Sequence, residues 1–217
     1  MLTRRTLVAS CGAIAAGFGA PARATGPSSM GLLRFDVLRN DGRIGQHVVR
    51  LLRDGDAVRA EITVEIAIGI GPITVYRYSH AVREEWRDGL FQWMESRTND
   101  DGTRHEVRAE RTAEGVRVRR LDGESLLAAG TIPLTHWNYQ CMRAKLFNPQ
   151  TGLPLQLSAR PRETDILDLG NGRTLRARRY EIEGETQMQT WYDAEGTWRA
   201  LQSVGRDRSM IRYRPIA

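Results

Sequence analysis

The fold of this chain is decided by the stretch AVRAEITVEIAI, residues Ala57–Ile68. Apolar side chains occupy every second position from Val58 to Ile68, and most positions between them carry charged or hydroxyl side chains. Alternation with a period of two predicts a β-strand that buries one face and exposes the other. Residues Val75–Trp86 repeat the pattern with an aromatic face. We therefore expect a sheet with one apolar and one charged face.

Short turns of the type Asp-Gly, Glu-Gly or Asn-Gly punctuate the rest of the chain, and such dipeptides favour tight hairpins between antiparallel strands. They stand at Asp41-Gly42, Asp54-Gly55, Asp88-Gly89, Asp101-Gly102, Glu114-Gly115, Asp122-Gly123 and Asn171-Gly172. Strands joined in this way pair with their neighbours along the chain, and large sheets tend to curl. The pattern predicts a mainly β protein, either a single large curved antiparallel sheet or a partly closed β-barrel of about a dozen strands.

One segment, from about residue 125 to residue 152, breaks this rhythm. Thr135 could cap a short helix over residues 136–147, which Asn148-Pro149 would end. A sheet with an apolar concave face needs a helix or a ligand to cover that face, so we expect one short helix there. Because no linker-like composition separates the two halves, residues 25–217 are expected to form a single antiparallel β-domain.

The first 24 residues have the three parts of an export signal. Arg4-Arg5 precedes an apolar segment from Leu7 to about Ala20, and Ala22-Arg23-Ala24 forms a cleavage site of the small-x-small type. The paired arginines favour the twin-arginine route. The apolar segment is shorter than the roughly 20 residues that span a bilayer, which argues against a transmembrane anchor. We expect residues 1–24 to be removed and the protein to be soluble and periplasmic, with the twin-arginine machinery and signal peptidase as its export partners.

The box Val8-Ala9-Ser10-Cys11 offers a competing interpretation, in which Cys11 is lipidated. Too little apolar chain lies between the paired arginines and Cys11 for a normal hydrophobic region, so we favour cleavage after Ala24. Cleavage leaves Cys141 as the single cysteine, which excludes an internal disulfide. Its apolar neighbours favour an inert, packed thiol.

The net charge of +6 overstates the basicity of the mature domain. Residues 1–24 include three arginines and no acid, so 29 basic and 26 acidic residues remain and the net charge falls to +3. The remaining arginine clusters alternate with or lie near acidic residues, as they do on a solvated strand face. We therefore expect no nucleic-acid partner.

Five short segments stand out along the domain: Arg34–Gly45, Tyr76–His80, Ser96–Arg104, His136–Asn138 and Trp191–Asp193. Together they resemble a family of exported bacterial proteins catalogued as domain of unknown function 6134, and the resemblance covers nearly all of residues 25–217. It implies a single exported β-domain. It supplies no catalytic residue, because the family has no assigned activity.

No motif in the sequence identifies a cofactor or a metal site. His47, His80, His105 and His136 lie on different segments, without the short spacing of a metal-binding motif. Gly69-Ile70-Gly71-Pro72 lacks the third glycine and the following helix of a dinucleotide-binding loop, which indicates a bend or bulge. We therefore expect no cofactor and no metal.

The first candidate binding cluster is Tyr76, Tyr78 and His80, which share one strand face. Either face of the following strand could oppose them. One face carries Trp93, and the other carries Met94. Aromatic rings with polar tips can line a ligand pocket through stacking and hydrogen bonds. The same residues would also suit a layer of the hydrophobic core in which the histidine has a hydrogen-bond partner.

The second candidate cluster is His136, Trp137 and Asn138, at the entry to the expected helix. These side chains could bind a ligand at the mouth of the curved sheet. A tryptophan at such a place also anchors a helix, and histidine or asparagine also caps backbone groups, so a structural role stays open.

The leading functional hypothesis is a soluble periplasmic binding or carrier module for an apolar or amphipathic ligand, such as a lipid or an envelope-polymer fragment. One alternative is a periplasmic hydrolase or isomerase with His80 or His136 as general base and a nearby carboxylate. Another is an envelope-assembly module that docks by an exposed strand edge. A continuous cavity favours the first, a histidine bonded to a carboxylate in a cleft the second, and a filled core with an open edge the third.

Overall fold

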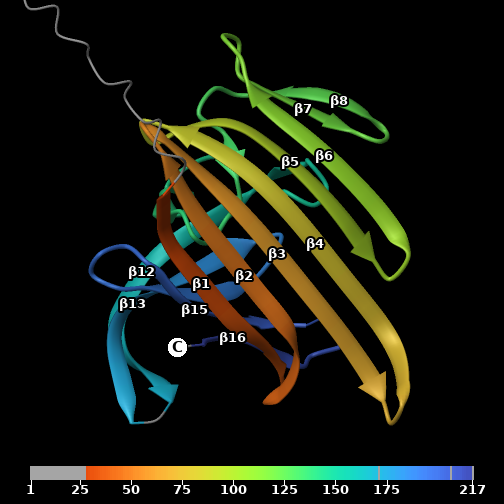
Figure 1. Cartoon of the computed structure of the whole chain (residues 1–217), viewed down its shortest axis with the longest axis vertical. Coiled ribbons are helices and arrows are strands. Elements are labelled where there is room, and N and C mark those ends of the chain that lie inside the picture. Colours follow the sequence, from red (N-terminus) through yellow and green to blue (C-terminus); the bar gives the residue numbers. More distant parts are fainter. Residues whose placement is uncertain (1–27, 171, 206, 217) are drawn as a thin grey trace, which may run out of the picture.

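The computed structural model describes residues 28–170, 172–205 and 207–216 (Figure 1). The expected export signal at residues 1–24, with Cys11, lies outside the described residues. In the part of the chain that is described, we find no helix with the length and apolar character needed to cross a membrane.

Thirteen strands form one continuous antiparallel sheet, in the order β12-β13-β14-β15-β16-β1-β2-β3-β4-β5-β6-β7-β8. They are β1 (Ser28–Arg39), β2 (Gly42–Asp54), β3 (Ala57–Ile70), β4 (Ile73–Arg87), β5 (Leu90–Asp100), β6 (Thr103–Arg111), β7 (Val116–Arg120), β8 (Gly123–Leu127), β12 (Leu157–Gly170), β13 (Arg173–Gly184), β14 (Met188–Tyr192), β15 (Trp198–Val204) and β16 (Met210–Pro215). The last strand, β16, pairs with β1. The two halves of the chain therefore meet in the middle of the sheet, and β12 and β8 are its end strands.

This architecture confirms the expected single large antiparallel sheet. Figure 1 shows that it curves strongly, so that β13 and β15 run across the direction of β2–β5. In the described part of the chain the end strands do not pair with each other, and the sheet stays open.

The expected turns hold the hairpins together. At the β4–β5 turn, Asp88 and Gly89 have φ of 50° and 73°, and at the β5–β6 turn Asp101 and Gly102 have φ of 49° and 97°. Two consecutive residues with positive φ give the turn whose twist matches that of the strands it joins, and Asp-Gly is well suited to it. The sequence signal and the local geometry therefore agree.

The register places matching residues of neighbouring strands on the concave face. Across β1 to β5, Phe35 pairs with His47, His47 with Val64, Val64 with His80, and His80 with Thr98. All five are buried. The period of two in each strand thus builds an apolar layer that also brings two histidines to the same face.

Residues 128–156, here called the covering segment, lie over the concave face. They contain β9 (Ile132–Pro133), β10 (Leu146–Phe147) and β11 (Pro154–Leu155), which form a small sheet in the order β11-β10-β9. Phe147 packs edge-on against Phe91 of β5, with ring centroids 6.1 Å apart. The segment therefore covers the concave face, as expected, but largely without a helix.

The expected helix over residues 136–147 is wrong in extent. The structure has only one 3-10 turn, η1 (Tyr139–Met142), and its N-terminal cap is Asn138 rather than Thr135: the Asn138 side chain accepts the Gln140 N–H at 3.0 Å. Parallel pairing of β9 with β10 uses both ends of the segment. This pairing and the burial of Cys141 and Met142 fix the path of the segment, so tertiary contacts override the helical pattern.

Cys141 is buried in η1 and belongs to the hydrophobic core, in the apolar surroundings that were expected. Its Sγ donates to the backbone oxygen of Thr135 at 3.0 Å. Burial raises the pKa of the thiol to about 12, so the thiol stays protonated at neutral pH.

Candidate functional site

A cavity of about 330 Å³ lies between the concave face and the covering segment. Strands β2, β3, β4 and β16 supply one wall, and the covering segment supplies the other. The sheet contributes His47, Val49, Ile62, Val64, Ile66, Tyr76, Tyr78, His80, Val82, Glu84 and Tyr213, and the covering segment contributes Leu134, Thr135, His136, Trp137, Asn148, Pro149 and Gln150.

The cavity deepens along β4. Its lining is half-buried at Ile66, Tyr76 and Tyr78, near the β3–β4 turn, and buried at His80 and Glu84. We call the first end the mouth and the second the floor. Every second residue of β4 from Tyr76 to Glu84 lines it, because alternate side chains point to the same face.

Glu84 is the acid at the floor, and its side chain is 1% exposed. Its Oε2 accepts hydrogen bonds from Trp86 Nε1 at 2.9 Å and from Trp137 Nε1 at 3.1 Å. Burial raises the pKa of the carboxyl to about 7, and the two indole donors together with the nearby Thr135 hydroxyl oppose that rise. At neutral pH the protonated and ionised forms of this carboxyl are therefore both populated.

Three histidines line the same cavity, and all of them are uncharged at neutral pH. Burial lowers the pKa of His80 and of His136 to about 4 and that of His47 to about 3, with the neighbouring histidines contributing for His47. The Nδ1 atom of His80 lies 2.7 Å from Thr98 Oγ1. The ring of His136 stacks on Trp198, and the ring of His47 meets the same indole edge-on; both centroid distances are 5.1 Å.

Buried polar atoms without a hydrogen-bond partner concentrate at this cavity. In the described part of the chain there are six such side-chain atoms, and five of them belong to residues in the cavity lining. These five are His47 Nδ1, His47 Nε2, Glu84 Oε1, Thr135 Oγ1 and His136 Nδ1. Buried polar groups are nearly always hydrogen-bonded in folded proteins, so these five atoms set the cavity apart from the rest of the described core.

Two tyrosines frame the mouth. Tyr76 donates its hydroxyl to Asp100 Oδ1 at 2.8 Å, and Tyr78 donates to Gln150 Oε1 at 3.1 Å. The second bond ties the sheet to the covering segment. Burial raises the pKa of Tyr78, so its hydroxyl remains a donor.

The structure brings five of the seven predicted site residues to this cavity: Tyr76, Tyr78, His80, His136 and Trp137. Trp93 does not line it. A β-bulge at Glu85 and Trp86 shifts the register of β5, so Phe91 and Met94 are buried on the concave face while Trp93 pairs with Glu85 on the convex face.

Asn138, the other predicted residue outside the lining, caps η1 instead. The cavity residues not predicted as site residues include His47, Glu84, Thr135 and Tyr213. Glu84 carries a signal in the sequence, because it is the only acid on the aromatic face of Val75–Trp86. His47 shares a strand face with Val49, but nothing local shows that this face points into the same hollow as β4.

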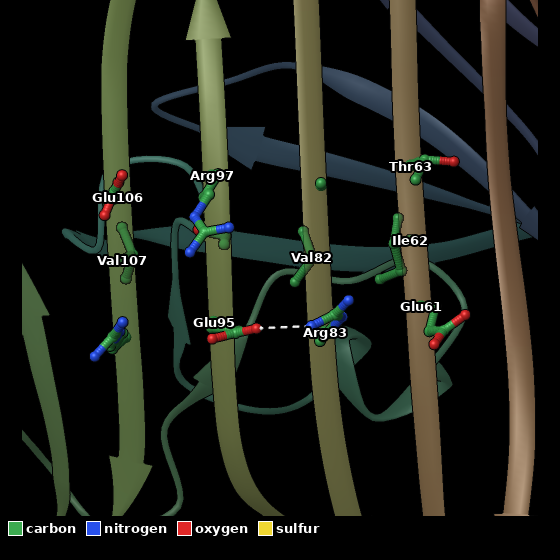
Figure 2. Close-up of a pocket in the computed structure, with 12 residues that line it drawn as sticks. Glu61, Ile62, Thr63, Val82, Arg83, Glu95, Arg97, Glu106 and Val107 are labelled. Atoms are coloured by element: carbon green, nitrogen blue, oxygen red, sulfur yellow. Dashed lines mark hydrogen bonds and ion pairs between the residues drawn. The ribbon is translucent and has the colours of Figure 1, made fainter.

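A second hollow of about 260 Å³ lies over β3–β6 (Figure 2). It centres on the convex side, where exposed Ala81 leaves room between longer side chains. Paired positions alternate in charge across the strands, from Glu61 to Arg83, Glu95 and Arg108, and Arg83 Nη1 lies 3.3 Å from Glu95 Oε1. This hollow belongs to a solvated face crossed by ion pairs, so it is the weaker candidate.

The arrangement offers little to a metal ion or to a histidine general base. Among the described residues, no three or more His, Cys, Asp or Glu side chains are grouped so as to hold a metal ion. His80 contacts a threonine and His136 an indole ring, so the observed bonds orient neither imidazole toward a carboxylate. What the cavity offers is an apolar wall, stacking surfaces and unpaired hydrogen-bonding atoms.

The fold and the cavity define a class of protein. It is an open, strongly curved antiparallel β-sheet whose concave face and covering segment enclose a cavity lined by apolar and polar side chains. Within this class, the chain belongs to the family of domain of unknown function DUF6134, whose model matches residues 35–216. This confirms the resemblance seen in the sequence.

Among solved structures, the chain is similar to a beta-barrel-like protein of domain of unknown function DUF1849 from Brucella abortus. The TM-score is 0.61 at 8% sequence identity, and the match covers 85% of this chain and 95% of the other. At such low identity the likeness concerns the fold alone. No curated protein matches this chain.

Proposed function

We propose that this protein is a periplasmic binding or carrier module that holds a small apolar or amphipathic ligand in the concave cavity. The observation that carries the proposal is the concentration of five unpaired buried polar atoms in the lining of one cavity. A core layer would bury such atoms only at a cost of about 1–3 kcal/mol each. A bound ligand would supply their partners.

The walls of the cavity support an apolar body for that ligand. Val49, Ile62, Val64 and Val82 line it from the sheet, and Leu134 lines it from the covering segment. Small-molecule sites combine such predominantly apolar walls with a few placed polar groups. The export signal expected at residues 1–24 supports a periplasmic location.

The alternative functions have less support. A general-base enzyme would need an imidazole oriented by an acid, and His80 and His136 have other contacts. For docking by a strand edge, the long end strand β12 is poorly suited, because Pro161 and flanking charges such as Arg160 and Arg162 discourage pairing with another chain.

Native mass spectrometry tests the proposal. The mature protein, purified from its own periplasm under gentle conditions, should carry a bound mass that denaturing extraction releases. Ile66→Trp places a large ring at the mouth and should abolish the bound mass. Glu65→Trp puts the same ring on the exposed convex face one residue earlier and should retain it. A clean unbound mass for the native protein, or equal occupancy in both variants, would contradict the proposal.

A further inference from the structure

Resting on the proposed function, we propose that the ligand is an uncharged amphiphile whose hydroxyl or amide group binds at the floor of the cavity, beside Glu84, Thr135 and His136. The proposal names the class of ligand. It rests on the grouping of the unpaired atoms, the charges of the lining and the size of the cavity.

Two of the unpaired atoms, Glu84 Oε1 and Thr135 Oγ1, belong to neighbouring side chains at the floor of the cavity. The Thr135 hydroxyl is close enough to Glu84 to lower the pKa of its carboxyl, yet neither Thr135 Oγ1 nor Glu84 Oε1 has a hydrogen-bond partner. His136 follows Thr135 directly in the chain and leaves Nδ1 unpaired, and His47 lies against the same indole of Trp198 as His136. The polar end of a ligand therefore has its partners at the floor.

The lining argues against an anionic ligand. Its described residues include no arginine and no lysine, and burial keeps its three histidines neutral by lowering the pKa of each to about 4 or below. A carboxylate or phosphate at the floor would lose its water without meeting a counter-ion. It would also stand beside the Glu84 carboxyl.

The lining argues against a cationic ligand as well. Glu84 is the only acid among the lining residues that the structure describes, and its Oε2 already accepts two indole N–H groups. Its side chain is 1% exposed, so an ammonium group would have to give up nearly all of its water to reach Oε1. The electrostatic attraction within a single buried ion pair rarely offsets the free-energy cost of that desolvation.

An uncharged hydroxyl or amide matches the floor, since each both donates and accepts hydrogen bonds. The same group can donate to ionised Glu84 or accept from the protonated form, and it can also pair with Thr135 or His136. The volume of about 330 Å³ lies at the small end of the range of about 300–1,000 Å³ for small-molecule sites. It suits one short chain or ring system rather than a two-chain lipid.

A matched set of eight-carbon probes tests this inference: 1-octanol, octanoate and octylammonium, titrated by calorimetry at pH 7.5 into the mature protein. We expect 1-octanol to bind at least about tenfold more tightly than either charged analogue, because burying an unpaired charge is costly. Thr135→Val keeps the side-chain shape and removes the hydroxyl. It should weaken 1-octanol about fivefold or more, whereas Thr63→Val on the exposed convex face should leave binding unchanged.

The outcomes separate the two proposals. If octanoate or octylammonium binds as tightly as 1-octanol in a manner that Ile66→Trp abolishes, the cavity is a binding site and the uncharged class is wrong. An unchanged 1-octanol affinity in Thr135→Val also overturns the placement of the polar group. If none of the probes binds, or all bind equally to Ile66→Trp, the cavity is not a site for small amphiphiles and both proposals fail.

Discussion

Trp137 Nε1 donates a hydrogen bond of 3.1 Å to Glu84 Oε2, which joins the covering segment to the floor of the sheet across 53 residues of chain. The same oxygen accepts from Trp86 Nε1 at 2.9 Å, and the two indole rings meet edge-on with centroids 5.8 Å apart. One buried carboxyl thus fixes the position of the segment that forms the far wall of the cavity.

Removing this donor should destabilise the protein in a pH-dependent way. In Trp137→Phe the ring is smaller and the N–H is gone, and a hydrogen bond to an ionised acceptor contributes about 1.5–3 kcal/mol against about 0.5–1.5 for a neutral one. The loss in unfolding free energy should therefore be larger at pH 8, where Glu84 is mostly ionised, than at pH 5. Urea denaturation at both pH values measures it.

Trp93→Phe is the matched control for this prediction. Trp93 is half-buried on the convex face opposite Glu85, away from the cavity. The same substitution there should cost less than about 1 kcal/mol with no difference between the two pH values. Equal pH dependence in both variants would show that the indole bond to Glu84 does not stabilise the ionised carboxyl.

The buried carboxyl itself should make the wild-type protein less stable as the pH rises. The pKa of Glu84 is raised from 4.5 to about 7, so the folded state holds the proton more tightly than the unfolded state does. The resulting stabilisation is fully present below about pH 4.5 and is lost as the pH rises through 7. Relative to Glu84→Gln, whose amide oxygen can still accept from both indoles, the wild-type unfolding free energy should fall by a few kcal/mol between pH 4.5 and pH 8.

Glu85→Gln is the control for the pH profile. Glu85 is the next residue along β4, faces the convex side and lies 3.2 Å from Arg59 Nε. Its substitution should give a curve parallel to that of the wild type. A constant difference between wild type and Glu84→Gln across this range would contradict the raised pKa.

The positions of Tyr76, Tyr78, His80 and Glu84 on one face follow from the period of two in β4, and this part of the site could be predicted from sequence. The partner of Glu84 could not, because Trp137 reaches it only once the covering segment has folded over the sheet. The helix predicted over residues 136–147 failed for the same reason. Its local pattern is helical, but β9 and β10 pair in parallel around it.

Trp93 shows a different limit of sequence analysis. Strict alternation leaves two possible faces for β5. The β-bulge between Glu85 and Trp86 breaks that alternation, so that Phe91 and Met94, three residues apart, are buried on the same face. A bulge adds one residue to one strand and so changes which side chains meet across the pair. No turn residue or composition marks this bulge in the sequence, so the face on which Trp93 lies depends on the strand register and not on the local sequence.

His47 should be replaceable by phenylalanine with a gain in stability. Both ring nitrogens are buried without a partner, and the ring lies among the aromatic rings of Phe35, Trp198 and Tyr213. His47→Phe removes two unpaired polar atoms from this cluster, so we expect an increase of about 1–2 kcal/mol in unfolding free energy at pH 7. If the ligand pairs with His47, the same variant should bind it less tightly.

The pH dependence of His47→Phe has the opposite sign to that of Glu84→Gln. The pKa of His47 is lowered from 6.5 to about 3, so the folded state takes up a proton less readily than the unfolded state, and the wild type loses stability as the pH falls below about 6.5. The advantage of the variant should therefore grow between pH 7 and pH 5. His105→Phe, at a half-buried position near the start of β6, should show neither effect. A loss of stability in His47→Phe at both pH values would show that the ring nitrogens are paired in solution.

Gly45 should tolerate no side chain, because β2 and β3 approach closely at this point. A Cβ atom built on Gly45 would lie 1.9 Å from the backbone oxygen of Glu65, and real Cβ atoms do not come so near. The obstacle is backbone engaged in strand pairing, which cannot move aside as a flexible side chain would. Gly45→Ala should therefore separate β2 from β3 locally and lower the unfolding free energy by about 3 kcal/mol or more, measured by urea denaturation.

Gly31→Ala is the control, since its Cβ would meet no atom within 4 Å, and it should change stability by less than about 1 kcal/mol. Because Gly45 pairs with Ile66 at the mouth of the cavity, equal stability of the two variants would also mean that the strands near the mouth can separate without loss.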